Sequence, residues 1–123
     1  MSSSKNALIY KVCTIAEWQD ARAKGAFEGS RIDLEDGFVH FSTALQLRET
    51  VIRHFAGLRD LMLVEVKTDD LGKMLKWEQS RGGDLFPHLY RPLPLEAVTR
   101  EWPLPLGLDA QHQFPGDLEL SGG

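Results

Sequence analysis

The segment that decides the fold reads DGFVHFSTALQ, residues 36–46. Its first two residues, Asp-Gly, are a turn signal, and the five that follow, FVHFS, have the aromatic and β-branched character of a strand. Alternation along that strand places Phe38, His40 and Ser42 on one face. The last four residues, TALQ, form a capping-box pattern. The segment therefore predicts a turn, a strand and a helix start in immediate succession.

Outward from this segment, the first half of the chain alternates strands and helices. Upstream, LIYKV at 8–12 predicts a strand, and a second capping box predicts a helix over about residues 14–24. The polar stretch Gly29–Glu35 is interpreted as a connection. Downstream, apolar residues spaced by three and four predict a helix that runs to about Phe55 with one buried stripe.

The second half contains mainly strand patterns. LMLVEV at 61–66 is almost continuously apolar, as in a strand buried on both faces. Residues 74–78 fit either a strand or a helical turn, and SRGGD at 80–84 is a flexible loop by composition. Extended patterns return at 86–90 and 97–102. This order favours an α+β domain with a mixed or antiparallel sheet and two main helices in the N-terminal half.

Length and composition indicate one small domain. The 123 residues suit a single domain at 8–102, after a polar leader (1–7) that lacks the apolar core of a secretory signal and before a loosely ordered tail (103–123). A net charge of −4 with interspersed signs argues against duplex DNA as a partner, and no stretch approaches the ~20 apolar residues of a membrane span. Because Cys13 has no second cysteine to pair with, we expect a cytoplasmic protein.

Two histidines are the candidate catalytic side chains. His40 lies on an apolar strand just before a helix N-terminus, where anionic groups dock, and its ring is able to orient a ribose or to act as acid or base. His88 alternates with Tyr90 in FPHLY, and an imidazole beside a phenol suits ligand stacking and proton donation. The alternatives are a His40 hydrogen-bonded within the core, and an exposed His88 beside a Tyr90 packed at a sheet edge.

Further polar residues are candidate ligand-binding groups, each with a structural alternative. Ser42 and Thr43 are placed to face a ligand at the helix start, although one of them caps the helix. Lys11 and Arg81 are candidates for phosphate contacts, although most surface cations only face solvent. Glu78 and Arg81 flank the glycine-rich loop, where an ordinary surface ion pair is the simpler interpretation.

Motifs for metal and phosphate binding are missing from the sequence. It has no zinc-site spacing, no His-Glu-x-x-His, no P-loop and no Gly-x-Gly-x-x-Gly. The acidic group Asp33, Glu35 and Asp36 could hold a metal, and a metal-assisted hydrolase would use His40, His88 and Asp36. A solvated turn explains the acidic group more simply, so no metal is expected.

Taken together, these segments resemble one family over about residues 8–100. They are Ile9-Tyr10-Lys11, Trp18 and Gly25, DGFVHFST at 36–43 with Gln46 and Thr50, Trp77-Glu78, and GGDLFPHLY at 82–90. On these motifs the chain is identified as a member of the uncharacterised, mainly bacterial family catalogued as domain of unknown function 952. That family resembles the ADP-ribosyltransferase fold, a split mixed sheet that holds nicotinamide adenine dinucleotide (NAD) in a central cleft.

The resemblance implies roles for individual residues. The first strand of that fold offers a ribose- or phosphate-contacting side chain, which corresponds to Tyr10 or Lys11. His40 stands where poly-ADP-ribose polymerases place a tyrosine that stacks on nicotinamide. The third motif of the fold supplies a catalytic glutamate, but the similar segment here, PHLY, has His88 instead. RNA 2′-phosphotransferases share the fold without that glutamate, and fold alone does not establish the reaction.

The resemblance thus implies a protein that binds NAD or a related small phosphorylated nucleotide, as an ADP-ribosyl- or phospho-transferase. The alternatives are a non-catalytic nucleotide-binding module, which the missing glutamate favours, and a metal-assisted hydrolase. The expected catalytic residues are His40 and His88, and the expected ligand-binding residues are Tyr10, Lys11, Ser42, Thr43, Glu78, Arg81 and Tyr90.

Overall fold

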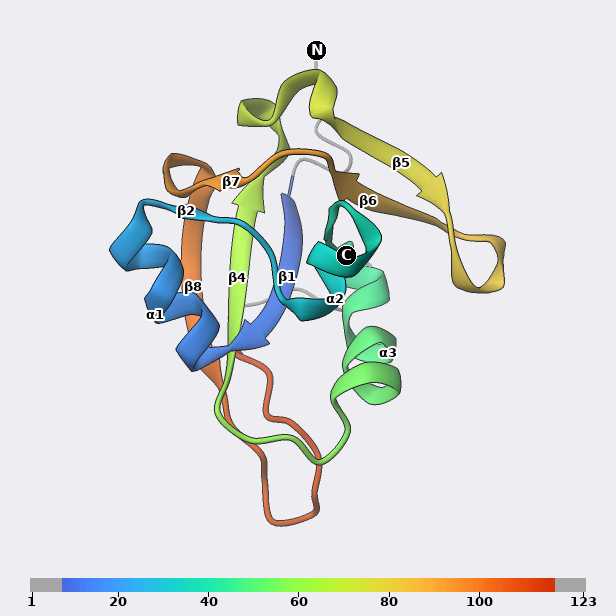
Figure 1. The fold of residues 1–123 in the computed structure, drawn as a ribbon. Helices are drawn as coiled ribbons and strands as arrows, with labels where there is room; N and C mark the ends of the chain where they lie inside the picture. Colours follow the sequence, from blue (N-terminus) through green and yellow to red (C-terminus); the bar gives the residue numbers. More distant parts are fainter. Residues whose placement is uncertain (1–7, 117–123) are drawn as a thin grey trace.

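A computed structural model describes residues 8–116 of the chain, apart from the side chain of Arg81. The expected leader (1–7) and the last part of the expected tail (117–123) lie outside the described residues. Within the described range the fold is α+β, with three α-helices and three small antiparallel β-sheets (Figure 1). The expected alternative of a mixed sheet does not occur among these residues, because every strand pair there is antiparallel.

A three-stranded sheet forms the centre of the molecule. Its strands lie in the order β1-β4-β8, with bounds Leu8–Thr14, Leu61–Lys67 and Val98–Leu104. Because side chains alternate along a strand, β1 contributes Ile9 and Cys13 to one hydrophobic cluster and Tyr10 and Val12 to the other. The sheet is therefore buried on both faces, which explains the nearly continuous apolar sequence of β4.

Helices α1 (Ile15–Lys24) and α3 (Ala44–Phe55) cover opposite faces of this sheet (Figure 1). Trp18 of α1 packs in the first cluster, and Leu47 of α3 packs in the second. Both helices begin with the capping boxes expected from the sequence. Their predicted ends at about Lys24 and Phe55 are also confirmed.

The expectation of a polar connection at Gly29–Glu35 is wrong, because this stretch contains helix α2 (Arg31–Asp36). Ser30 is its N-cap, and the Asp33 carboxylate accepts the Ser30 backbone N–H at 2.8 Å. This is a capping box with aspartate in place of the usual Glu or Gln. At six residues the helix is too short to show an apolar stripe. Gly37, at φ 88°, ends it in the left-handed conformation that favours glycine.

The second three-stranded sheet, in the order β3-β6-β5, has bounds Val39–His40, Leu85–Leu89 and Leu75–Gln79. The strand expected over 38–42 is therefore shorter than predicted. Phe41 donates its backbone N–H to Pro87 of β6 at 3.0 Å. The next residue, Ser42, instead exchanges two backbone hydrogen bonds with Tyr10 of β1, at 2.8 and 2.9 Å. The quoted segment thus crosses from one sheet to the other.

The remaining elements close the fold. A short pair of strands, β2 (Ala26–Phe27) and β7 (Leu93–Pro94), lies beside α1. Beyond β8, Phe114 packs against the second cluster, with the Arg48 guanidinium of α3 at 4.9 Å from its ring centroid. None of the helices in residues 8–116 has the length and apolar character needed to cross a membrane.

Candidate functional site

The two candidate histidines lie directly opposite each other on adjacent strands. His40 of β3 pairs in register with His88 of β6, and His88 pairs with Lys76 of β5. These three side chains form one row on one face of the sheet, because neighbours in register share a face. The neighbouring row, Val39, Leu89 and Leu75, packs into the first hydrophobic cluster. We call the His40–His88–Lys76 side the paired-histidine face.

An aromatic ring connects the histidines. The Phe38 ring stacks on His88 at a centroid distance of 4.2 Å and an angle of 29°, and lies 4.5 Å from His40 and 5.1 Å from Tyr90. The two imidazoles are themselves 5.5 Å apart, edge to face. The alternation of the quoted segment places Phe38 beside His40, but sequence reasoning did not assign Phe38 a role in the site.

Glu78 holds His88 and Tyr90 from the neighbouring strand. His88 Nδ1 lies 2.8 Å from Glu78 Oε1, and the Tyr90 hydroxyl donates to the same oxygen at 2.7 Å. The bonds from Tyr90 and then His88 lower the pKa of Glu78, and the bond to Glu78 raises the pKa of Tyr90. His88 is only 5% exposed, so the alternative of an exposed histidine is wrong. The expected Glu78–Arg81 contact lies outside the described side chains.

Asp33 holds His40 from helix α2. Its Oδ1 lies 2.6 Å from His40 Nδ1 and accepts the His40 backbone N–H at 3.1 Å. The Lys11 ammonium of β1 lies 2.9 Å from Oδ1 and 2.7 Å from Oδ2. At 1% exposure, Asp33 is not part of a solvated turn, which corrects the interpretation from sequence. Sequence reasoning missed the pairing of Asp33 with Lys11, because the two residues are 22 positions apart and no local pattern links them.

The charge of Asp33 is maintained by its hydrogen bonds. Burial alone would raise the pKa of this carboxyl, but the bonds from His40 and Lys11, with the charge of Lys11, outweigh burial and hold the pKa well below its ordinary value. On the outer side of the ring, His40 Nε2 lies 3.0 Å from Oδ2 of Asp36, which is 45% exposed. His40 is 33% exposed and thus lies between a buried and an exposed carboxylate.

Two of the expected ligand-binding residues point into the protein. Lys11 is 5% exposed and is engaged by Asp33, so its ammonium lies behind His40 rather than on the surface. Tyr10 projects from the opposite face of β1, where its hydroxyl donates to buried Glu65 at 2.9 Å. Glu65 also accepts hydrogen bonds from Thr99 and Arg100. The structure therefore separates Tyr10 from the paired histidines.

Ser42 and Thr43 have structural partners. The Ser42 hydroxyl lies 2.8 Å from the Thr50 hydroxyl of α3. The Thr43 hydroxyl accepts the Gln46 backbone N–H at 3.2 Å, and the Gln46 side chain accepts the Thr43 N–H at 3.0 Å. This is the capping function that the sequence indicated as the alternative to ligand contact.

Thr43→Ala tests the capping role. We expect it to lower the free energy of unfolding by about 1 kcal/mol, because one N-terminal amide of α3 loses its acceptor. Thr43→Ser keeps a hydroxyl and should retain most of the wild-type stability. Urea denaturation of the three proteins measures the difference. An alanine variant as stable as wild type would contradict the capping role.

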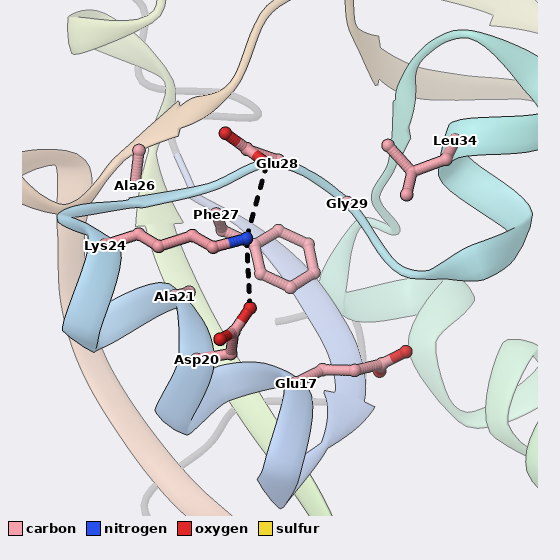
Figure 2. Close-up of a pocket in the computed structure, with 9 residues that line it drawn as sticks. All are labelled: Glu17, Asp20, Ala21, Lys24, Ala26, Phe27, Glu28, Gly29 and Leu34. Atoms are coloured by element: carbon pink, nitrogen blue, oxygen red, sulfur yellow. Dashed lines mark ion pairs between the residues drawn. The ribbon is translucent and has the colours of Figure 1, made fainter.

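No cluster of metal ligands is present among residues 8–116, and a pocket lies apart from this face. Among residues 8–116 no group of three or more His, Cys, Asp or Glu side chains is arranged to hold a metal ion. A pocket of about 150 Å³ lies elsewhere, between α1 and the segment leading to α2 (Figure 2). Lys24 crosses it and pairs with Asp20 and Glu28. No residue of the paired-histidine face lines that pocket.

Comparison with known proteins identifies the family of the chain. The family described as "Protein of unknown function (DUF952)" matches residues 12–101, a span that contains Asp33, Glu78 and both histidines. The chain belongs to the DUF952 family. This confirms the family assignment made from the motifs in the sequence. None of the curated proteins compared with this DUF952 chain matches it.

Solved structures share the fold of this DUF952 protein. A crystal structure of protein CC0527 from Caulobacter crescentus is 52% identical, with a TM-score of 0.83, and the match covers 86% of this chain and 93% of that one. The solution NMR structure of CC0527 is 51% identical with a TM-score of 0.77, and covers 87% and 92% of the two chains. A double-mutant crystal form gives a TM-score of 0.82 at 51% identity, with coverage of 86% and 93%.

Proposed function

We propose that this DUF952 protein binds NAD or a related small phosphorylated nucleotide of the cytoplasm at the paired-histidine face, and transfers an ADP-ribosyl or phosphoryl group from it. The observation that supports this most is the arrangement of His40 and His88. The two residues are paired on the adjacent strands β3 and β6. Nδ1 of His40 lies within hydrogen-bond distance of Asp33, and Nδ1 of His88 lies within hydrogen-bond distance of Glu78. Histidines oriented in this way are suited to proton transfer and to hydrogen bonding with a ribose.

Aromatic side chains supply a surface for a base or a nicotinamide ring. Phe38, His40 and Tyr90 are each only partly buried, and the Phe38 ring centroid lies 4.5 Å from that of His40 and 5.1 Å from that of Tyr90. Planar heterocycles stack on such rings, at about 1–3 kcal/mol per base where this has been measured. The adjacency of Phe38 and Tyr90 therefore supports a nucleotide over a purely aliphatic ligand.

Lys76 takes the phosphate role first expected of Lys11. It is exposed, and it shares the face of both histidines. Its Nζ lies 5.8 Å from the Tyr90 ring centroid. Lys11 is buried against Asp33 and cannot reach a ligand on this face without breaking that pair. Arg81 remains a second candidate on sequence grounds.

The ADP-ribosyltransferase-like resemblance supports a transfer reaction. The PHLY segment has no glutamate, but β5 brings the Glu78 carboxylate to within hydrogen-bond distance of His88 and Tyr90 in that segment. Glu78 is thus a candidate for the role that the glutamate of the fold plays at the ribose. A non-catalytic binding module is the second candidate, because both ring nitrogens of His40 already face carboxylates.

Calorimetric titration tests the proposal. NAD and AMP would be added, up to millimolar concentration, to wild type, His40→Ala and Lys76→Ala, with His54→Ala on α3 and Lys24→Ala on α1 as matched controls. We expect binding to wild type and both controls. We expect at least tenfold weaker binding to His40→Ala, which loses a hydrogen bond and a stacking surface, and severalfold weaker binding to Lys76→Ala, which loses one phosphate contact.

If wild type binds neither nucleotide at millimolar concentration, the proposed function is wrong. Binding that is equally strong in His40→Ala and wild type would place the ligand elsewhere on the protein. If binding is confirmed, mass spectrometry of reaction mixtures supplied with an acceptor distinguishes a transferase from a binding module. A transferase yields nicotinamide with an ADP-ribosylated acceptor, or a phosphorylated acceptor with the dephosphorylated nucleotide, whereas a binding module leaves the nucleotide intact.

A further inference from the structure

The buried Asp33 carboxylate, which contacts His40, is surrounded by several nitrogen atoms. Three nitrogen atoms converge on Oδ1 of Asp33: the Lys11 ammonium, the His40 backbone nitrogen and His40 Nδ1, at 2.9, 3.1 and 2.6 Å. Oδ2 accepts the Ser30 N–H and also meets Lys11, at 2.8 and 2.7 Å. Asp33 and Lys11 are both buried, at 1% and 5% exposure.

We infer that Asp33, with its charge balanced by Lys11, is a positioning residue that keeps the His40 proton on Nδ1 and so makes Nε2 the atom that meets the ligand. The part of this inference that concerns the ligand rests on the proposed function. The part that concerns the tautomer stands on the contacts of Asp33 alone.

The tautomer follows from the hydrogen-bonding capacity of the two groups. An ionised carboxylate only accepts, whereas each imidazole nitrogen donates or accepts according to its proton. The low pKa of Asp33 keeps it ionised, so a nitrogen 2.6 Å from Oδ1 must carry a proton. A lone pair on Nδ1 would face a negatively charged oxygen in a site with little water. Nε2 therefore holds the exchangeable proton or the lone pair.

Lys11 balances the charge of Asp33, so His40 does not have to be protonated to do so. A buried carboxylate with no cation would need His40 itself as its counter-ion, and His40 would be locked in the protonated state. With Lys11 within 2.9 Å of both carboxylate oxygens, Asp33 is already neutralised. His40 thus remains able to give or take a proton at Nε2 while its ring stays in place.

Two further carboxylates, Asp36 and Glu78, contact the paired histidines. Asp36 contacts Nε2 from the exposed end of α2, and this contact is attractive only while Nε2 carries a proton. Because Asp36 is 45% exposed, its side chain is free to rotate into solvent when a ligand oxygen replaces it. Glu78 holds Nδ1 of His88 as Asp33 holds Nδ1 of His40. Each histidine therefore has its Nδ1 on a carboxylate of a neighbouring element, and in His40 the Nε2 contact is to the partly exposed Asp36.

The test is a long-range ¹H–¹⁵N correlation spectrum of the uniformly ¹⁵N-labelled, ligand-free protein, which shows which ring nitrogen carries the proton. His40 is assigned among the four histidines by its absence from the His40→Gln spectrum. The spectrum is recorded at neutral pH and at a pH high enough for the ring to hold one proton. We expect that remaining proton on Nδ1. A proton on Nε2, or an even mixture of tautomers, would overturn the inference.

Two variants separate positioning from simple structural support. Asp33→Asn combined with Lys11→Met removes both charges at nearly constant volume, and an amide no longer dictates one tautomer. We expect a mixture of His40 tautomers and about tenfold weaker AMP binding, by analogy with metal sites, where the groups that orient a ligating histidine carry effects of about 10- to 100-fold. Asp36→Asn should retain the Nδ1 proton. A folded double variant with the wild-type tautomer would refute the role of Asp33.

The outcomes also distinguish this inference from the proposed function. If the Nδ1 tautomer is found but neither NAD nor AMP binds, the positioning of His40 stands and the nucleotide is wrong. If the nucleotides bind but His40 carries its proton on Nε2, the proposed function stands and the positioning role fails. Should the double variant not fold, the wild-type spectrum alone decides.

Discussion

Asp33→Ala is expected to lower the free energy of unfolding by about 3–5 kcal/mol, the cost typical of removing one partner from a buried ion pair. The substitution leaves the Lys11 ammonium 5% exposed with no carboxylate beside it. It also leaves two backbone N–H groups, those of Ser30 and His40, without their acceptor. In thermal unfolding the expected change is a melting temperature about 10–20 °C lower.

A second substitution shows whether the uncompensated charge causes this loss. Asp33→Ala with Lys11→Met should recover part of the stability, because a methionine side chain fills the space of the lysine stem without a charge. The backbone amides still lack their acceptor, so recovery should be incomplete. An exposed pair, Arg53 with Glu49, serves as the control, since Glu49→Ala should cost well under 1 kcal/mol. If Asp33→Ala costs as little, the pair does not stabilise the fold as described.

The free energy of unfolding is expected to fall by several kcal/mol as the pH is lowered from about 5 to about 2. Asp33 and Glu65 both have pKa values below their ordinary range in the folded protein. In each case burial acts in the opposite direction and is outweighed by hydrogen bonds, from His40 and Lys11 to Asp33 and from Arg100, Thr99 and Tyr10 to Glu65. The unfolded chain therefore binds more protons than the folded one below the ordinary carboxyl pKa of about 4.

The sign of this linkage is fixed by the direction of the shifts. A carboxyl whose pKa is lowered by folding stabilises the protein fully above its unfolded pKa, and this stabilisation is lost as the pH falls toward the folded pKa. Asp33 alone should account for about 2–3 kcal/mol. Urea unfolding at half-unit pH intervals measures the slope. Asp33→Asn with Lys11→Met should show a shallower slope than wild type, and an unchanged slope would contradict the assignment to Asp33.

The sequence by itself determined the elements whose signals are local. The starts of α1 and α3 were predicted from two capping boxes, Thr14 with Glu17 and Thr43 with Gln46. This was possible because a capping box involves only residues three apart. The continuous apolar run of β4 reports its own burial on both faces. The motifs around His40 and His88 were sufficient to identify the family. Each of these signals is contained in a few neighbouring residues.

Tertiary structure alone decided which residues of the candidate site contact each other. Helix α2 escaped detection because six residues cannot display a periodic apolar face. Asp33 was interpreted as solvated because nothing near it in sequence reveals Lys11, which lies 22 residues earlier. Glu78 joins His88 only through the pairing of β5 with β6. Burial of a charge depends on partners brought together by the fold. For that physical reason local sequence patterns named the two histidines and Glu78, but not the contacts of Asp33 and Glu78 with those histidines.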